Sequence, residues 1–143
     1  MITAALPHSP AEFIVLHGLT SSVVIEAHAD EAPLWRYWGP RLRDDPSPPL
    51  LRDTRPLPSF MLDFDQPLAP TFGVGWFGQS ALLAHRDGRD FAQAFTRCEW
   101  QWVEPMRSVK LKLLDNVSSL TLAITLSLDA HDVLLMRSEL ANT

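Results

Sequence analysis

The sequence has 143 residues, of which 46% are hydrophobic and 20% are charged, and it carries a net charge of −5. This length allows one domain with a modest core and is too short for two, and the composition is that of a folded protein. The negative charge and the dispersed basic residues argue against nucleic acid as a partner, because nucleic-acid binders cluster Lys and Arg.

Further features concern the compartment and possible metals. The N-terminus lacks a basic start followed by an apolar run, and no uncharged apolar stretch is long enough to cross a bilayer. Cys98 is the single cysteine, so neither an internal disulfide nor a four-thiolate metal site can form. We therefore expect a cytoplasmic protein with no membrane contact, no metal and no cofactor.

The front of the chain contains three segments that we expect to be strands, at residues 13–16, 22–28 and 33–38. Residues 44–70 differ, because they contain prolines at positions 46, 48, 49, 56, 58, 67 and 70. Proline cannot donate to a sheet ladder and favours extended backbone before it. We predict an ordered surface excursion with short edge strands at most, near residues 57–60, anchored by Phe60, Leu62, Phe64 and Leu68. A linker between domains is the alternative.

The second half of the chain alternates between apolar and polar residues with a period of two. The clearest run is residues 120–128, and similar runs cover 94–103, 109–113 and 133–140. This period is typical of half-buried strands, and the short polar connections between the last three runs predict an antiparallel meander. The fold class is therefore all-β, a single antiparallel β-sandwich over residues 1–143.

Paired carboxylates and histidines are the first candidates for chemistry. Asp63 and Asp65 share a strand face, and Asp44 is followed by Asp45, but acidic neighbours in a proline-rich loop are usually only solvated. The five histidines include no i, i+4 pair of the kind that binds zinc on a helix, so we expect surface or turn positions. Cys98 lies in an alternating segment and is expected to be a buried apolar residue. We assign no catalytic residue.

The tryptophans are more informative. An indole face can stack on the C–H face of a pyranose ring, or it can simply fill a core. Four tryptophans, Trp35, Trp38, Trp100 and Trp102, lie in expected strands, where core or sheet-covering roles are favoured. Trp76 follows two glycines in a segment typical of a loop, and glycine allows a tight backbone that presents the next side chain. For Trp76 the two interpretations stay open.

Three stretches carry recognisable patterns. Residues 33–42 (PLWRYWGPRL) match an apolar P-x-x-x-Y-W-G-x-x-L pattern, and residues 70–82 (PTFGVGWFGQSAL) match a P-T-[FY]-G-x-G-x-[FY] loop pattern. The last expected strands end in ELANT, like the exit of a sandwich strand. In these three stretches the chain resembles glycoside hydrolase family 36, the bacterial α-galactosidases.

The resemblance implies a longer enzyme. It implies a front galactose-mutarotase-like supersandwich, then a catalytic (β/α)₈ barrel that carries both catalytic aspartates, and a small final β domain. Because the family sandwich is longer than 143 residues, we expect a truncated front portion. The resemblance also implies a homo-oligomer and assigns Trp76 and Phe77 to a loop that approaches substrate, although many relatives have an acidic residue where Trp76 stands.

The leading functional hypothesis is therefore a non-catalytic front domain of an α-galactosidase that hydrolyses terminal α-galactosides of the raffinose type. Its partners would be the missing catalytic barrel of the same polypeptide, a second copy of the chain, and the galactoside. The alternatives are a free-standing carbohydrate-binding β-sandwich module and a protein-interaction β-sandwich unrelated to sugars.

Overall fold

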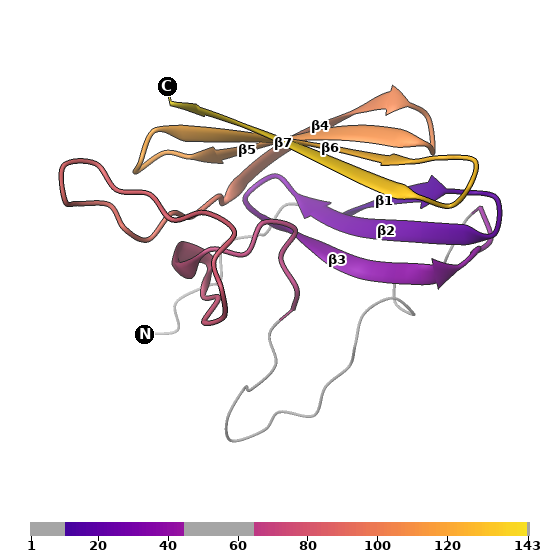
Figure 1. The fold of residues 1–143 in the computed structure, drawn as a ribbon, viewed down its shortest axis with the longest axis horizontal. Helices are drawn as coiled ribbons and strands as arrows, with labels where there is room; N and C mark the ends of the chain where they lie inside the picture. Colours follow the sequence, from indigo (N-terminus) through magenta and orange to yellow (C-terminus); the bar gives the residue numbers. More distant parts are fainter. Residues whose placement is uncertain (1–10, 45–64, 143) are drawn as a thin grey trace, which may run out of the picture.

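The structure is a computed structural model that describes residues 11–44 and 65–142. Figure 1 shows two antiparallel sheets stacked on each other, which confirms the predicted all-β sandwich. The first sheet has the order β1-β2-β3 and the second the order β4-β5-β6-β7. Their bounds are Glu12–His17 (β1), Ser21–His28 (β2), Glu31–Pro40 (β3), Arg97–Glu104 (β4), Ser108–Asp115 (β5), Leu120–Leu128 (β6) and Leu134–Asn142 (β7).

The core lies between the two sheets and follows from the alternation of the strands. In β5, Val109, Leu111 and Leu113 are fully buried, while Lys112 between them is exposed. Their register partners on β6 include Leu126 and Ile124, so apolar residues of neighbouring strands share the inner face. The first sheet adds the inner face of β1 and β2, with Ile14, Leu16, Val23, Ile25 and Ala27.

The predicted strands are present with small shifts in their bounds. The largest shift concerns the run 94–103, because β4 begins only at Arg97. The backbone N–H of Ala94 donates to Asp115 Oδ2 at 2.9 Å, and that of Thr96 donates to the carbonyl of Ala94 at 2.9 Å. The second bond closes a tight turn and the first binds Ala94 to a side chain at the end of β5, and residues 94–96 lie outside the ladder with β5.

The strand β2 is the centre of the first sheet and is buried on both faces. Its six residues from Ser22 to Ala27 are all buried, including Glu26, which is 1% exposed. Strands covered on both sides do not show the clean alternation of half-exposed strands. The charge of Glu26 at this position therefore requires polar partners, which are described with the site below.

The strand β7 is the opposite case, an edge strand that is mostly exposed. Met136 pairs with Leu126 and Leu140 pairs with Leu122, so both point to the inner face of the second sheet. Yet Met136 is 47% and Leu140 49% exposed. Among the described strands, the first sheet meets the second at β4 and β6. The strand β7 therefore carries an apolar row, Met136 and Leu140, that is only partly covered.

The last residues of the proline-rich stretch attach to the edge of β3. The N–H of Trp35 donates to the Gln66 carbonyl at 2.8 Å, and the N–H of Leu68 donates to the Pro33 carbonyl at 2.7 Å. Leu68 is 3% exposed and belongs to the core. The other predicted anchors, Phe60, Leu62 and Phe64, and the predicted edge strand at 57–60 lie outside the described residues.

Candidate functional site

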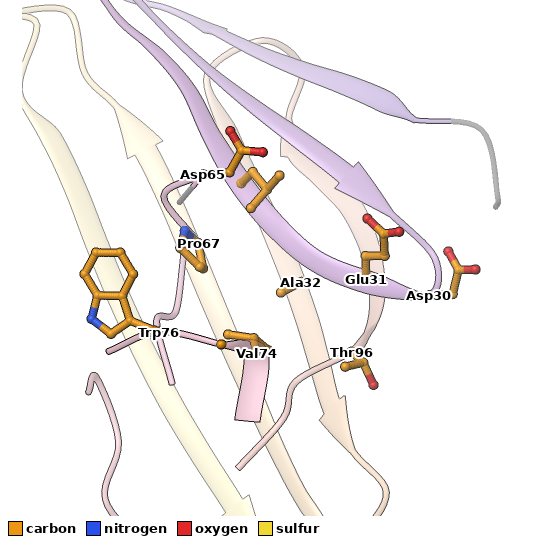
Figure 2. Close-up of a pocket in the computed structure, with 10 residues that line it drawn as sticks. Asp30, Glu31, Ala32, Asp65, Pro67, Val74, Trp76 and Thr96 are labelled. Atoms are coloured by element: carbon orange, nitrogen blue, oxygen red, sulfur yellow. The ribbon is translucent and has the colours of Figure 1, made fainter. Parts of the chain in front are cut away.

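The candidate site is a groove of about 360 Å³ that three separate segments form, next to the edge of β3. The turn between β2 and β3 contributes Asp30, the start of β3 contributes Glu31, the segment before Leu68 contributes Asp65 and Pro67, and the loop after Pro70 contributes Trp76. Figure 2 shows the carboxylates along one side and the indole at the other. The lining is completed by Ala32, Leu34, Val74, Gly75 and Thr96.

Of the two residues that the sequence assigned to a substrate loop, Trp76 lines this groove and Phe77 does not. Trp76 is partly buried, and its Nε1–H donates to the carbonyl of Gln79 at 3.1 Å. Phe77 is 84% exposed. The structure therefore separates the two side chains, and the groove contains the indole alone.

The loop that carries Trp76 is held by a short 3-10 helix, η2 (Phe72–Val74). Gly73 donates its N–H to the Gln93 carbonyl at 3.1 Å, and a Cβ there would lie 2.4 Å from that oxygen. Gly75 ends the helix at a φ of +84°, a conformation that favours glycine. The glycines that the sequence pattern singled out are thus required by backbone geometry just before Trp76.

Asp65 is a charged wall of the groove and part of an ion-pair network. Arg36 donates from Nη1 to Asp65 Oδ1 at 2.7 Å and from Nε to Glu26 Oε2. His28 Nε2 lies 3.0 Å from Glu26 Oε1. Burial opposes the charge of Arg36, but its hydrogen bonds to Asp65 and Glu26 outweigh burial and raise its pKa. The network connects the centre of the first sheet to the groove.

Of the other predicted carboxylates, Asp44 alone lies within the described residues, and it does not line the groove. Asp44 is 82% exposed at the end of the first described range, and Asp45 and Asp63 lie outside the described residues. Asp65, which the sequence suggested was only solvated, has an exposed fraction of 52% but is paired with Arg36. Nothing in the sequence pattern pointed to Asp30 and Glu31, because their place at the groove depends on segments far away in the chain.

The expectation of surface histidines is wrong for His17, which is 4% exposed. It ends β1 beside β2, where its Nδ1 lies 2.7 Å from Ser22 Oγ, and its Nε2 lies 3.7 Å from Asp44. Burial lowers the pKa of His17, the charge of Arg41 lowers it further, and Asp44 acts in the opposite direction. The order Asp–His–Ser is reminiscent of a hydrolase triad, but Ser22 is 0% exposed and cannot meet a substrate.

The strand tryptophans mostly confirm the core interpretation. Trp35, Trp100 and Trp102 pack against the core, and the rings of Trp100 and Trp102 meet edge to face with centroids 5.5 Å apart. The core interpretation is wrong for Trp38, which is 64% exposed, while the alternative of a sheet-covering role stays a prediction. Trp38 lies near the end of β3, which is an edge strand of the first sheet.

Cys98 confirms its predicted role as a small buried residue. It is 6% exposed, and burial, aided by the nearby charge of Glu99, raises the pKa of its thiol to about 12. Among the described residues there is no group of three or more His, Cys, Asp or Glu side chains that could hold a metal ion. The helices within the described ranges also include none with the length and apolar character needed to span a membrane.

Fold and site together define a β-sandwich domain with a ligand-sized groove beside the edge of one sheet. The family model described as "Glycosyl hydrolase family 36 N-terminal domain" matches residues 31–143, most of the chain. The chain therefore belongs to glycosyl hydrolase family 36, as the N-terminal domain of such a protein. Comparisons with curated proteins and with solved structures gave no match.

Proposed function

We propose that the chain is the non-catalytic front domain of an α-galactosidase that removes terminal α-linked galactose from raffinose-type oligosaccharides in the cytoplasm. The observation that carries this proposal is the family match over residues 31–143. The domain would support a catalytic barrel elsewhere in the same polypeptide. Its loop at Trp76 would lie at the entrance of the active site, as the family resemblance implies.

The chemistry of the groove agrees with a supporting role. A retaining glycosidase uses two carboxyl groups that face each other about 5 Å apart across the scissile bond. Asp65 instead has both carboxylate oxygens turned to Arg36, with Nη2 lying 3.5 Å from Oδ2 and Nη1 closer to Oδ1. An Asp committed to a guanidinium in this way holds a loop in place and is poorly suited to attack a sugar.

Hydrolysis assays test this proposal directly. The 143-residue chain is expected to leave nitrophenyl α-galactoside intact, while the natural polypeptide that contains it hydrolyses this substrate and not the β-anomer. The β-anomer is the control for specificity. Hydrolysis by the chain alone would overturn the non-catalytic role, and a full-length protein that ignores α-galactosides would overturn the proposed substrate.

The apolar row on β7 supports the second part of the proposal, that the domain packs against another body. Met136 and Leu140 are about half exposed on the inner side of an edge strand. Such rows are usually covered by protein. The chain alone is therefore expected to self-associate in light scattering at high concentration, and Leu140→Lys should reduce this. A clean monomer at high concentration would count against it.

A further inference from the structure

His17 is a buried histidine that neither the groove nor the proposed function uses. It ends β1 with 4% of its side chain exposed, and its Nδ1 lies 2.7 Å from the hydroxyl oxygen of Ser22 on β2. Its Nε2 is also buried and has no hydrogen-bond partner in the part of the chain that the structure describes. Buried polar atoms without a partner are rare in folded proteins, so this one requires an explanation.

The hydroxyl of Ser22 connects His17 to residues 41–44, the segment that leaves β3 and is called the exit segment below. The backbone N–H of Leu42 donates to Ser22 Oγ at 2.9 Å. Within the described ranges, the acceptor in reach of the hydroxyl proton is His17 Nδ1. The Ser22 hydroxyl therefore donates to Nδ1, and the proton of the neutral imidazole lies on Nε2. This chain of hydrogen bonds ties the exit segment to the β1–β2 hairpin.

Two charges of the exit segment act on the imidazole. Asp44 Oδ1 lies 3.7 Å from Nε2, so the inferred tautomer points its N–H toward a carboxylate. Arg41 donates from Nη1 to the carbonyl of Gly18, next to His17. Burial and the Arg41 cation lower the pKa of His17, and Asp44, which is 82% exposed and screened by water, opposes them only in part. The closed arrangement therefore favours a neutral imidazole.

The other elements around His17 hold it mainly through the backbone. Its own N–H donates to the carbonyl of Met106 in the β4–β5 turn at 2.7 Å, and β2 contributes the Ser22 hydroxyl. The titratable groups of the elements packed around His17 are Arg41 and Asp44 of the exit segment, Glu104 and Arg107 of the β4–β5 turn, and Asp132 of the β6–β7 turn. Of these, Arg41 and Asp44 shift the pKa of His17.

A second proton on His17 is incompatible with the closed arrangement. An imidazolium carries hydrogen on both ring nitrogens, so its Nδ1 cannot accept the Ser22 hydroxyl. The hydroxyl proton then loses its acceptor, and the charged ring is buried beside Arg41. Both changes are costly in a buried site. Separation of the exit segment from the hairpin relieves them, because water then reaches the ring and the hydroxyl.

We propose that His17 is a proton-operated latch, which holds the exit segment on the β1–β2 hairpin while the imidazole is neutral and releases it when the imidazole takes up a proton. The released form, with an ordinary histidine pKa of 6.5, binds the proton better than the latched form. The latch is therefore closed above about pH 7.5 and weakens as the pH falls below 6.5. This inference does not depend on the proposed α-galactosidase activity.

Hydrogen exchange of the Leu42 amide measures the latch in the 143-residue chain. Its protection factor, the exchange rate of an unstructured amide divided by the measured rate, should fall several-fold, and by about tenfold at most, from pH 7.5 to pH 5.5. In His17→Asn the side-chain oxygen can accept from Ser22 but does not titrate, so protection should stay constant. His131→Asn is the matched control, because His131 is 88% exposed and its removal should leave the fall intact. Constant protection in the natural chain, or an equal fall in His17→Asn, would overturn the proposal.

A second measurement needs no variant and decides the question if His17→Asn does not fold. In ¹⁵N–¹H spectra of the imidazole groups at pH 7.5, His17 should carry its proton on Nε2, and its pKa should lie below 6.5. The amide signal of Leu42 should shift with the same midpoint. A proton on Nδ1, or a Leu42 signal that does not follow the titration of His17, would contradict the latch.

Discussion

Asp132 accepts hydrogen bonds from both the backbone N–H and the hydroxyl of Ser21, at 3.0 and 2.8 Å, across 111 positions of sequence. Asp132 also accepts hydrogen bonds from Thr20, from its hydroxyl at 2.8 Å and from its backbone N–H at 3.0 Å. One carboxylate therefore joins the β1–β2 turn of the first sheet to the β6–β7 turn of the second.

Removal of this carboxylate should destabilise the sandwich. Asp132→Ala leaves the N–H groups of Thr20 and Ser21 without their acceptor, so the melting temperature should fall clearly. Asp132→Asn keeps one acceptor oxygen, so its melting temperature should lie between that of Asp132→Ala and that of the natural chain. Thermal unfolding followed by circular dichroism measures all three. Equal melting temperatures would show that the two turns do not depend on Asp132.

The same residue should shape the stability of the chain in acid. Hydrogen bonds from Ser21, followed by those from Thr20, lower the pKa of Asp132 from 3.8 to about 2, despite some desolvation. A lowered folded pKa gives a contribution that is complete above about pH 4 and is lost as the pH falls through about 2. The stability difference between the natural chain and Asp132→Asn should therefore shrink from pH 5 to pH 2. A constant difference would contradict this origin.

Cys98 should be almost inert while the chain is folded. With a thiol pKa of about 12, only roughly one part in 10⁴ is thiolate at pH 8, and the side chain is buried. A chromogenic disulfide reagent should therefore react slowly with the native chain and rapidly in denaturant. Fast reaction in native buffer would show that β4, which lies at the edge of its sheet, opens readily.

Two leucines on neighbouring strands should respond differently to truncation, although both point inward. Leu126 is fully buried, so Leu126→Ala should lower the free energy of unfolding by about 2–5 kcal/mol. Leu140 is 49% exposed, so Leu140→Ala should cost about 1 kcal/mol. Urea unfolding gives both values. A loss at Leu140 as large as that at Leu126 would mean that another copy of the chain covers β7 in solution.

Arg36 should matter for stability as well as for the groove. Arg36→Met removes the cation that faces the buried Glu26, and breaking a buried ion pair in this way costs about 3–5 kcal/mol. Asp65→Asn removes only the half-exposed partner and should cost about 1 kcal/mol or less. Denaturant unfolding compares the two. A similarly small loss of unfolding free energy in both variants would show that the charge of Glu26 is stabilised without Arg36.

Much of the sandwich could be predicted because its strands are locally encoded. Residues 109–113 and 120–128 alternate strictly, and a period of two has one structural solution when one face is buried. The tight loop before Trp76 could also be predicted, because its glycines mark backbone conformations that other residues adopt poorly. Phe77 shows the limit of such a pattern, because adjacent residues in a loop can point in unrelated directions.

The remaining features depend on contacts between segments that are distant in sequence. Asp30 in a turn and Glu31 at the start of β3 show no sign of a site in the sequence, because the groove also needs Trp76 and Asp65 from distant segments. His17 is buried where β1 pairs with β2 beside Ser22, and Trp38 is exposed near the end of an edge strand. Strand order and sheet stacking decide these cases, and neither follows from periodicity.

The burial of β2 on both faces has a consequence for the motions of the domain. Amide protons exchange with solvent only when their hydrogen bonds open, and the deepest strand opens last. The N–H groups of Val23 to Ala27 should therefore retain hydrogen long after those of β7 have exchanged for deuterium. Local opening would then begin at the exposed strand β7 and reach β2 last. The backbone around Glu26, where the ion-pair network is anchored, would be among the last parts of the domain to open.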